Sequence, residues 1–345
     1  MSLKNICFLF FLLLSSAAQA LHLVESCQIF GASGEVLLSL PGDRCIFFPD
    51  GRLVGSNSKV MRLVNTKRKV AWTLRTHLHH QLNLSVDQQS LLTLGSETIN
   101  VDGKKIRSDV LLKISMDGEI IARLSAQEIL KQTKLEGLRL EPSAVIREET
   151  NSDLELSHFN SFYEIPDLDP KAIVPSYIKR GNFIAGGLQL GIFILSSDLK
   201  TVLHHIQPPS SAHSALHDAQ ITYQGKVLIF NNIENNPGSP FNNSAIQELD
   251  PDSGKVLFSF TAEPKALFYS QFCGGAQRLS DDLILFSHLN NGTFIYNQKT
   301  KKIIYSTLKT HMYNGTFRTV QQVKAVEVSD FLKAWGVEPM DSLNL

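Results

Sequence analysis

The chain has 345 residues, of which 43% are hydrophobic and 19% are charged, so it can bury a sizeable core as one large domain or as two. Its 33 Lys and Arg residues balance its 33 Asp and Glu residues. A chain without net charge has no overall field that attracts nucleic acid or an anionic membrane, so any bound anion must be held locally. These values argue against a nucleic-acid partner.

Residues 1–20 have the pattern of a secretory signal peptide. Lys4 provides the basic start, residues 6–14 form the apolar segment, and Ala18-Gln19-Ala20 is a cleavage site of small residues. An uncleaved membrane anchor is the alternative, but the apolar run is short for a membrane span. No later segment is apolar enough to cross a bilayer. We therefore predict a soluble, exported mature chain in the periplasm, without a membrane span.

Export changes how the cysteines are interpreted. Cys7 leaves with the signal peptide, whereas Cys27, Cys45 and Cys273 remain in an oxidising compartment. Cys27 and Cys45 flank one predicted hairpin. They could form a disulfide or remain two buried thiols, because the sequence alone does not give the geometry that a disulfide needs. No spacing of Cys and His is typical of structural zinc, so no metal is predicted.

A short strand, a turn rich in Gly, Asp or Lys and a second strand recur along the chain. These hairpins begin at Gln28, Val60, Val110, Ile192, Ile246 and Thr293. Each of the last five follows a further apolar strand, as residues 227–230 follow the turn Gln224-Gly225. Three strands are therefore visible in each repeated unit.

The units recur about every 50 residues, which is the spacing of propeller blades. One unit cannot bury both faces of its sheet, whereas a closed ring of units can. Five full units and a partial one predict an all-β, six-bladed β-propeller over residues 21–345. Strands within residues 317–328 are expected to complete the blade begun near Gln28, followed by a short final helix. The least regular part, about residues 125–180, is predicted to be a helical and loop insertion.

Four histidines occupy corresponding places in these repeats. Each lies just before a strand of a unit, and they are His79, His80, His158 and His217. The strand that starts each blade of a propeller lies innermost, so we expect the loops that enter it to meet near the axis. The four side chains are then predicted to converge. Three others do not share this position and are interpreted as structural or solvated: His204, His205 and His213.

Four segments together resemble the ordered motifs of the arylsulfotransferase family. They are His79-His80-Gln81, Ser157-His158-Phe159-Asn160-Ser161, His217-Asp218-Ala219 with residues 228–232, and residues 247–256. The second and third segments are the more specific, because the turn in the fourth is common in propellers. The resemblance covers roughly residues 50–306. It implies a bacterial, periplasmic, PAPS-independent enzyme on a six-bladed propeller.

The resemblance also implies a mechanism. Family members move a sulfuryl group from a phenolic sulfate ester to a phenolic acceptor through a sulfohistidine, and His217 matches the nucleophile. His79, His80, His158 and Asn160 match positions that bind the sulfate and assist proton transfer, and Asp218 is expected to contact substrate. A neutral imidazole is a good nucleophile near neutral pH, and nearby donors can hold the sulfuryl oxygens. This scheme requires no cofactor and no metal.

Two positions depart from the family pattern. The sulfate-binding arginine is expected in the strand after His158-Phe159-Asn160-Ser161, but residues 184–190 contain no arginine. Leu or Gln cannot replace the bidentate fork of a guanidinium group, although Arg180 or Arg278 could compensate from elsewhere. The acid expected after the paired histidines is replaced by Gln81.

Three functions therefore remain open. The preferred one is a histidine-dependent sulfotransferase, because a purely structural ring has little reason to hold both the His217 and the His158 motifs. The missing arginine favours a non-catalytic ligand-binding or assembly propeller. A metal-dependent lyase or hydrolase with clustered histidines is the third, and metal content would separate it from the first.

Overall fold

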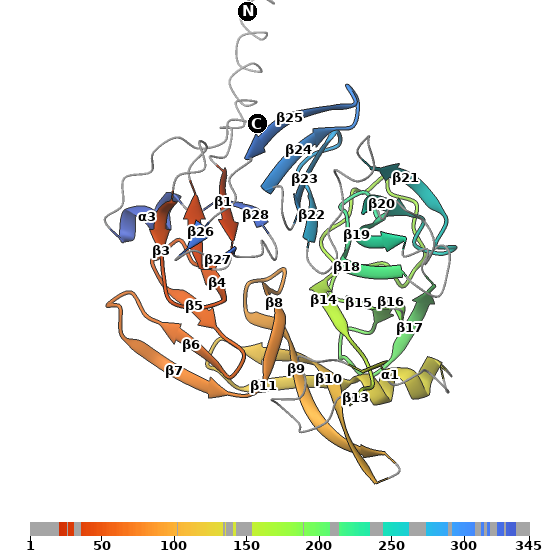
Figure 1. The fold of residues 1–345 in the computed structure, drawn as a ribbon, viewed down its shortest axis with the longest axis horizontal. Helices are drawn as coiled ribbons and strands as arrows, with labels where there is room; N and C mark the ends of the chain where they lie inside the picture. The colour runs from red at the N-terminus through yellow and green to blue at the C-terminus, as the bar shows by residue number, and fades with distance from the viewer. Residues whose placement is uncertain are drawn as a thin grey trace, which may run out of the picture.

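Antiparallel sheets arranged around a common centre make up most of the molecule (Figure 1). The computed structural model describes residues 21–25, 27–30, 36–101, 103–133, 135, 141–142, 154–188, 190–207, 214–234, 244–261, 274–288, 292–307, 312–313, 316–317, 323–327 and 329–335. The predicted signal peptide and Cys273 lie outside these residues. Within them, no helix has the length and apolar character needed to span a membrane.

Five sheets in the described part of the chain have four strands each. Their strands, in spatial order, are β28 (Val323–Glu327), β1 (Leu21–Glu25), β2 (Gln28–Phe30) and β3 (Val36–Ser39); β4 (Arg44–Phe47), β5 (Leu53–Ser56), β6 (Val60–Val64) and β7 (Val70–Arg75); β14 (Phe159–Glu164), β15 (Phe183–Gly187), β16 (Gly191–Leu195) and β17 (Val202–Ile206); β18 (Ser214–Ile221), β19 (Val227–Glu234), β20 (Ala245–Leu249) and β21 (Val256–Phe260); and β22 (Gly274–Arg278), β23 (Leu283–His288), β24 (Gly292–Asn297) and β25 (Lys302–Thr307).

A six-stranded sheet lies between the second and third of these sheets (Figure 1). It contains β8 (Leu78–Leu84), β9 (Ser90–Val101), β10 (Lys104–Ser115), β11 (Ile120–Ser125), β12 (Glu141–Pro142) and β13 (Leu154–Glu155). A separate pair is formed by β26 (Met312–Tyr313) and β27 (Thr316–Phe317), and the helices in the described residues are α1 (Ala126–Thr133) and α3 (Ser329–Ala334). The predicted all-β propeller is therefore confirmed, whereas its predicted count of six blades is not.

The innermost strands are the elements that the sequence analysis missed. The three strands visible in each unit are present, and a further strand, β4, β8, β14, β18 or β22, precedes them. These five strands lie nearest the centre of the ring (Figure 1). The histidine pair at residues 79–80 and His217 therefore lie inside strands rather than in loops before them. The reason is composition: these strands carry His, Asn, Gln and Asp in place of an apolar run.

The core is divided among the interfaces between sheets. One cluster joins β9 and β10 to β14 and β16 through side chains such as Leu94, Leu111, Phe159 and Phe193. A second cluster joins the sheet of β15 to that of β18, and a third joins the sheet of β5 to that of β8. The sheets of β8 and β14 thus bury both faces against their neighbours, as propeller blades must. This packing fixes the inner strands relative to one another.

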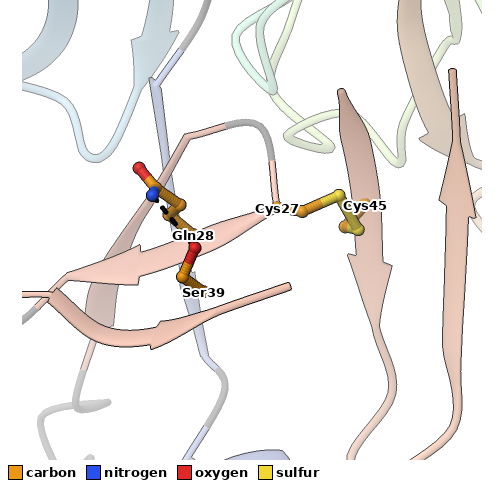
Figure 2. Close-up of a disulfide and its surroundings, with 4 residues drawn as sticks. All are labelled: Cys27, Gln28, Ser39 and Cys45. Atoms are coloured by element: carbon orange, nitrogen blue, oxygen red, sulfur yellow. Dashed lines mark hydrogen bonds between the residues drawn. A yellow bond between two sulfur atoms is a disulfide. The ribbon is translucent and has the colours of Figure 1, made fainter. Parts of the chain in front are cut away.

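Two connections close the first sheet and tie it to the next. β28 pairs antiparallel with β1, which confirms the predicted completion of the first sheet by the C-terminal part of the chain. A disulfide joins Cys27 to Cys45 across a separation of 18 residues (Figure 2). Cys27 lies beside β2 and Cys45 lies in β4, so the bond links two sheets rather than the two ends of one hairpin.

The predicted insertion at about residues 125–180 contains α1 and the short strands β12 and β13, but it also contains β14. Ser125 begins α1 with a capping box, in which its backbone N–H and hydroxyl both donate to the Glu128 carboxylate. The buried face of α1 packs Ile129 and Leu130 into the same cluster as Phe193. The helix is therefore part of the core packing at this interface.

Candidate active site

Three neighbouring inner strands are interrupted by a β-bulge at the histidine motifs. The register of β8 shifts between His79 and Leu82, that of β14 between Phe159 and Ser161, and that of β18 between His217 and Gln220. A bulge leaves extra residues without ladder partners and turns their side chains in a new direction. The recurrence of the bulge explains how polar side chains leave the regular alternation of the strand.

The backbone is strained at two of these bulges. His80 has a φ of 55° and Asp218 has a φ of 52°, in the left-handed region that few residues other than glycine adopt. His80 directly follows His79, and Asp218 directly follows His217. Such conformations persist only where the surroundings over-determine them, and they are concentrated at functional sites.

Hydrogen bonds between sheets hold the bulge at Asp218 in place. One carboxylate oxygen accepts hydrogen bonds from Gln81 Nε2 at 2.8 Å and from the Tyr163 hydroxyl, and the other accepts the Ala276 N–H at 2.9 Å. These donors come from β8, β14 and β22. Asp218 is only 2% exposed, so its carboxylate ties four inner strands together.

A second set of contacts fixes the backbone on both sides of His217. Asn160 Nδ2 donates to the Leu216 carbonyl at 2.8 Å, and the Ala219 N–H donates to Ser161 Oγ at 2.9 Å. The strands approach so closely that a Cβ atom on Gly186 would lie 2.6 Å from Leu216 and 2.7 Å from Ser161 Oγ. The motif around His158 therefore positions the strand that carries His217.

Three histidines form a chain of ring-to-ring contacts. His80 Nδ1 lies 2.6 Å from His79 Nδ1, and His80 Nε2 lies 3.1 Å from His158 Nε2. The ring of His80 meets each neighbour edge to face, with centroids 4.8 Å apart. His217 lies beside this chain, with its ring centroid 6.3 Å from that of His80. The four predicted histidines are therefore brought together, with His80 at their centre.

Acceptors lie at both outer ends of the histidine chain. His79 Nε2 is 3.2 Å from the Gly95 carbonyl and 3.1 Å from Asp109 Oδ1, while His158 Nδ1 is 3.1 and 3.2 Å from the two Glu155 oxygens. Arg107 lies between the two acids, 3.4 Å from Asp109 and 3.2 Å from Glu155. The buried charges of the two acids are thus both compensated.

We call His79, His80 and His158 the histidine relay, and its contacts determine how many protons it carries. A carboxylate or a carbonyl can only accept, so both outward-facing nitrogens must bear a proton. Each of the two nitrogen–nitrogen contacts also needs one proton. The three rings therefore share four protons on their ring nitrogens, one more than three neutral imidazoles carry. The fully hydrogen-bonded relay carries one positive charge.

The pKa directions place this charge at His158. Burial lowers the pKa of His80 well below its usual range, and the charges of His158, His79 and His217 lower it further. Burial also lowers the pKa of His79, against the opposing effect of Asp109. For His158, burial alone would lower the pKa, but the hydrogen bond to Glu155 and its charge outweigh burial and raise it. His158 is thus the ring best suited to hold the extra proton.

Neither of the two arginines that could have replaced the missing sulfate-binding arginine lies at the histidines. Arg180 is exposed and pairs with Asp167 at 2.9 Å. Arg278 pairs with the buried Glu248 and donates to Gln298 at 3.0 Å, so it serves the interface between sheets. Neither guanidinium contacts the histidine relay in the described residues. Gln81, which stands where an acid was expected, holds Asp218 and Asn83 instead of a histidine.

Sequence reasoning missed both acids that orient the relay. Asp109 and Arg107 lie in β10, and Glu155 lies in β13, which pairs in parallel with β10 at Arg107. A signal was present, because residues 107–109 read Arg-Ser-Asp directly before the apolar run 110–112 of one strand. Charged residues are rarely buried unless they are paired, so this interruption pointed to a buried ion pair.

Among the described residues, no group of three or more His, Cys, Asp or Glu side chains has the arrangement of a metal site. The relay nitrogens face one another and their acceptors instead of a common point. The arrangement can supply a nucleophilic imidazole beside a chain able to donate and recover one proton.

Comparison with known proteins agrees with this architecture. The sequence model of the arylsulfotransferase (ASST) family matches residues 77–309. A protein of unknown function from Bacteroides caccae has a similar fold, with a TM-score of 0.54 at 10% identity over 89% of this chain and 99% of that one. The WD40 domain of Neurospora crassa Pan2 gives a TM-score of 0.44 at 11% identity over 77% and 65% of the two chains. No curated protein matches the sequence.

Proposed function

Because this chain belongs to the arylsulfotransferase family, we propose that it transfers a sulfuryl group from a phenolic sulfate ester to a phenolic acceptor through a sulfohistidine at His217. Family membership supports aryl sulfotransfer in general and small aryl substrates. The covalent intermediate, the roles of the residues and the substrates in detail are our proposals.

The proposed first step forms an N–S bond and breaks an S–O bond. An imidazole nitrogen of His217 attacks the sulfur, and the phenolic oxygen leaves with the electron pair of the S–O bond. That oxygen takes a proton from the relay, which becomes neutral. In the second step an acceptor phenol attacks the sulfur, the N–S bond breaks, and the phenolic proton returns to the relay. A covalent intermediate divides one difficult transfer into two easier ones.

The observation that carries this proposal is the chain of ring contacts beside His217, whose hydrogen bonds require one excess proton. A positively charged group near the nucleophile favours an anionic ester and can neutralise the leaving phenolate. The low pKa of His80 keeps the central ring neutral, so it can accept a proton on one side while it donates on the other. The relay is therefore suited to move one proton towards the substrate and back.

Other residues have supporting roles in this proposal. We place Asp218 and Asn160 among the positioning residues, because both hold the backbone around His217. The signal-like residues 1–20 support export to the periplasm. We also propose that β8, β9, β10 and β11 act as one blade, which would give a ring of six.

The test is release of nitrophenolate from p-nitrophenyl sulfate by the mature protein, with and without added phenol. We expect turnover that depends on phenol and is lost in His217→Ala, together with a gain of one sulfuryl group on the peptide containing His217 when phenol is omitted. His204→Ala, a histidine of an outer strand, is the matched control and should retain full activity.

Absence of release from folded wild-type protein, on this ester and on a panel of aryl sulfates, would overturn the proposal. The binding propeller would then be preferred, since β15 lacks the family arginine. Full activity of His217→Ala would also exclude the sulfohistidine, even if the protein transfers sulfuryl groups by another route.

A further inference from the structure

Among the buried or half-buried arginines of the described residues, Arg44, Arg107 and Arg278 differ in their partners. Arg107 pairs with Asp109 and Glu155, and Arg278 pairs with Glu248. Arg44 is different: its Nε and Nη1 are buried, yet neither donates to any group in the described part of the chain. Burying a guanidinium group without a partner costs free energy, so such an arrangement calls for an anion that arrives from outside.

The direction of the Arg44 side chain follows from its neighbours in β4. Side chains alternate between the two faces of a strand, so Arg44 and Ile46 share one face and Cys45 lies on the other. Cys45 is bonded to Cys27 of the preceding sheet (Figure 2). Ile46 packs in the opposite direction, against the cluster that contains Leu78 and Leu82 of β8. Arg44 therefore faces the strand that carries His79 and His80.

Arg44 also lies at the same end of the inner strands, along the axis of the ring, as the histidines. The sheets of β4 and β8 are both built from the innermost strand outwards in chain order, so β4 and β8 run in the same direction. Arg44 is the first residue of β4, and His79 is the second residue of β8. Both strands lie nearest the centre of the ring (Figure 1). Arg44 thus occupies the end of its strand that corresponds to the histidine motifs.

We infer that Arg44 is the anion-binding arginine of this site, supplied from β4 in place of the arginine that β15 lacks. The inference rests on the proposed function for its substrate, a sulfate ester. A guanidinium group offers a rigid fork of donors that fits two oxygens of such an anion. Arg44 precedes residues 77–309, so comparison with the family motifs alone would not have identified it.

The charges around Arg44 agree with this role. Its positive charge contributes to the lowered pKa of His80, after burial and the three other histidines. Burial lowers the pKa of Arg44 itself, whereas the charge of the exposed Asp43 raises it. The charge of Arg44 thus acts on His80, the ring that lies next to His217. A monoanionic sulfate ester bound there would be neutralised from two sides.

The test separates binding from turnover. Binding of p-nitrophenyl sulfate is measured by titration calorimetry on His217→Ala, which removes the nucleophile, alone and combined with Arg44→Gln, Arg44→Lys or Arg62→Gln. Arg62 is an exposed arginine of the same sheet and is the matched control. We expect at least about 30-fold weaker binding with Arg44→Gln, a smaller loss with Arg44→Lys, and no change with Arg62→Gln. With the nucleophile present, Arg44→Gln should raise KM, and guanidinium ion should partly restore turnover.

The outcomes are distinguishable. Unchanged binding in Arg44→Gln, or no binding to the parent protein, overturns the role of Arg44 whatever the activity. Binding that depends on Arg44 in a protein that transfers no sulfuryl group upholds the anion site and overturns the proposed function. A melting temperature close to that of the parent shows that Arg44→Gln is folded. If it is not folded, Arg44→Lys decides the question, because it keeps the charge and loses only the fork.

Discussion

Two pairs of adjacent histidines lie in different parts of the same propeller. His79 and His80 belong to β8 at the centre, whereas His204 and His205 belong to β17 at the outer edge of its sheet. The inner pair contacts other histidines and an acid. The outer pair stacks on aromatic rings, His204 on Tyr177 and His205 on Phe193, with centroids 4.7 and 4.6 Å apart.

The difference teaches that a histidine pair becomes a site through its partners. The outer rings contact backbone carbonyls, with His204 Nε2 3.0 Å from Asp252 O and His205 Nε2 2.8 Å from Leu190 O. Both residues keep a ladder partner in β16, and the register shift of their strand falls before them, at Leu203. A backbone carbonyl can accept a hydrogen bond but has no negative charge that would stabilise a protonated imidazole. The inner rings share a proton between two carboxylates, across a bulge that breaks the ladder. The sequence motif, two adjacent histidines, is the same in both places.

The largest expected difference between the pairs is in turnover. His80→Ala interrupts the relay between His79 and His158, so kcat should fall by about 10²–10⁴-fold, the range usual for loss of proton transfer. His204→Ala should leave kcat unchanged. Steady-state rates with p-nitrophenyl sulfate and phenol measure both variants. Equal rates for the two would show that the inner pair has no special role.

The next effect concerns the acids beside each pair. Asp218→Ala leaves the Gln81, Tyr163 and Ala276 donors without their acceptor, so the free energy of unfolding should fall by about 3 kcal/mol. Asp252→Ala removes only an exposed hydrogen bond from Tyr177 and should cost less than about 1 kcal/mol. Chemical denaturation monitored by fluorescence gives both values. A loss below about 1 kcal/mol in Asp218→Ala would contradict its role in tying the inner strands.

A third effect is a shift in pH dependence. His158 has a raised pKa because of Glu155, and transfer that needs its proton falls as the pH rises through that raised pKa. Glu155→Gln removes the charge, so the falling limb of the rate profile should move to lower pH. Glu97→Gln, at an exposed ion pair with Arg123, is the control that should not move it.

The contact between His158 and Glu155 also makes the free energy of unfolding depend on pH. Because the folded pKa of His158 is raised, its contribution to the free energy of unfolding is fully present below the pKa of the unfolded chain, about 6.5. It is lost as the pH rises through the folded value. Glu155→Gln should flatten this part of the stability profile. A profile parallel to that of the wild type would show that Glu155 does not set the charge of His158.

The smallest effect is expected at the outer pair. Burial lowers the pKa of His205, so the folded protein loses stability as the pH falls below about 6.5, where the unfolded chain takes up the proton. His205→Phe keeps a ring on Phe193 and removes this dependence, at the cost of one hydrogen bond to Leu190 O. The free energy of unfolding at pH 7 should change by less than about 1.5 kcal/mol, and turnover should not change. A large loss of turnover would place the outer pair in the site.

The repeat pattern predicted the propeller because it depends on apolar runs and turns, and both are local. The strands at residues 227–230 and 283–286 were visible for that reason. The innermost strands were not predicted, because β8 and β18 are rich in polar residues, which are typical of loops, and each contains a residue with a positive φ. A closed ring supplies hydrogen bonds that such a sequence does not find locally.

The candidate site divides in the same way. The convergence of His79, His80, His158 and His217 followed from their recurrence in the repeat. Their partners Asp109 and Glu155 did not, because β10 and β13 are brought together by a parallel contact that no local pattern encodes. The direction of Arg44 depends on which face of β4 the disulfide occupies, and the sequence left that disulfide undecided.

The pairing of β28 with β1 sets an order of events during synthesis. Residues 21–25 leave the ribosome early, but their partner strand, residues 323–327, is made after the strands of all the other described sheets. Until then β1 keeps an open edge, and a ring built from such distant partners folds slowly. A chain released before residue 327 could not close its first sheet and would expose that edge to other chains. Completion of the ring therefore distinguishes finished chains from interrupted ones.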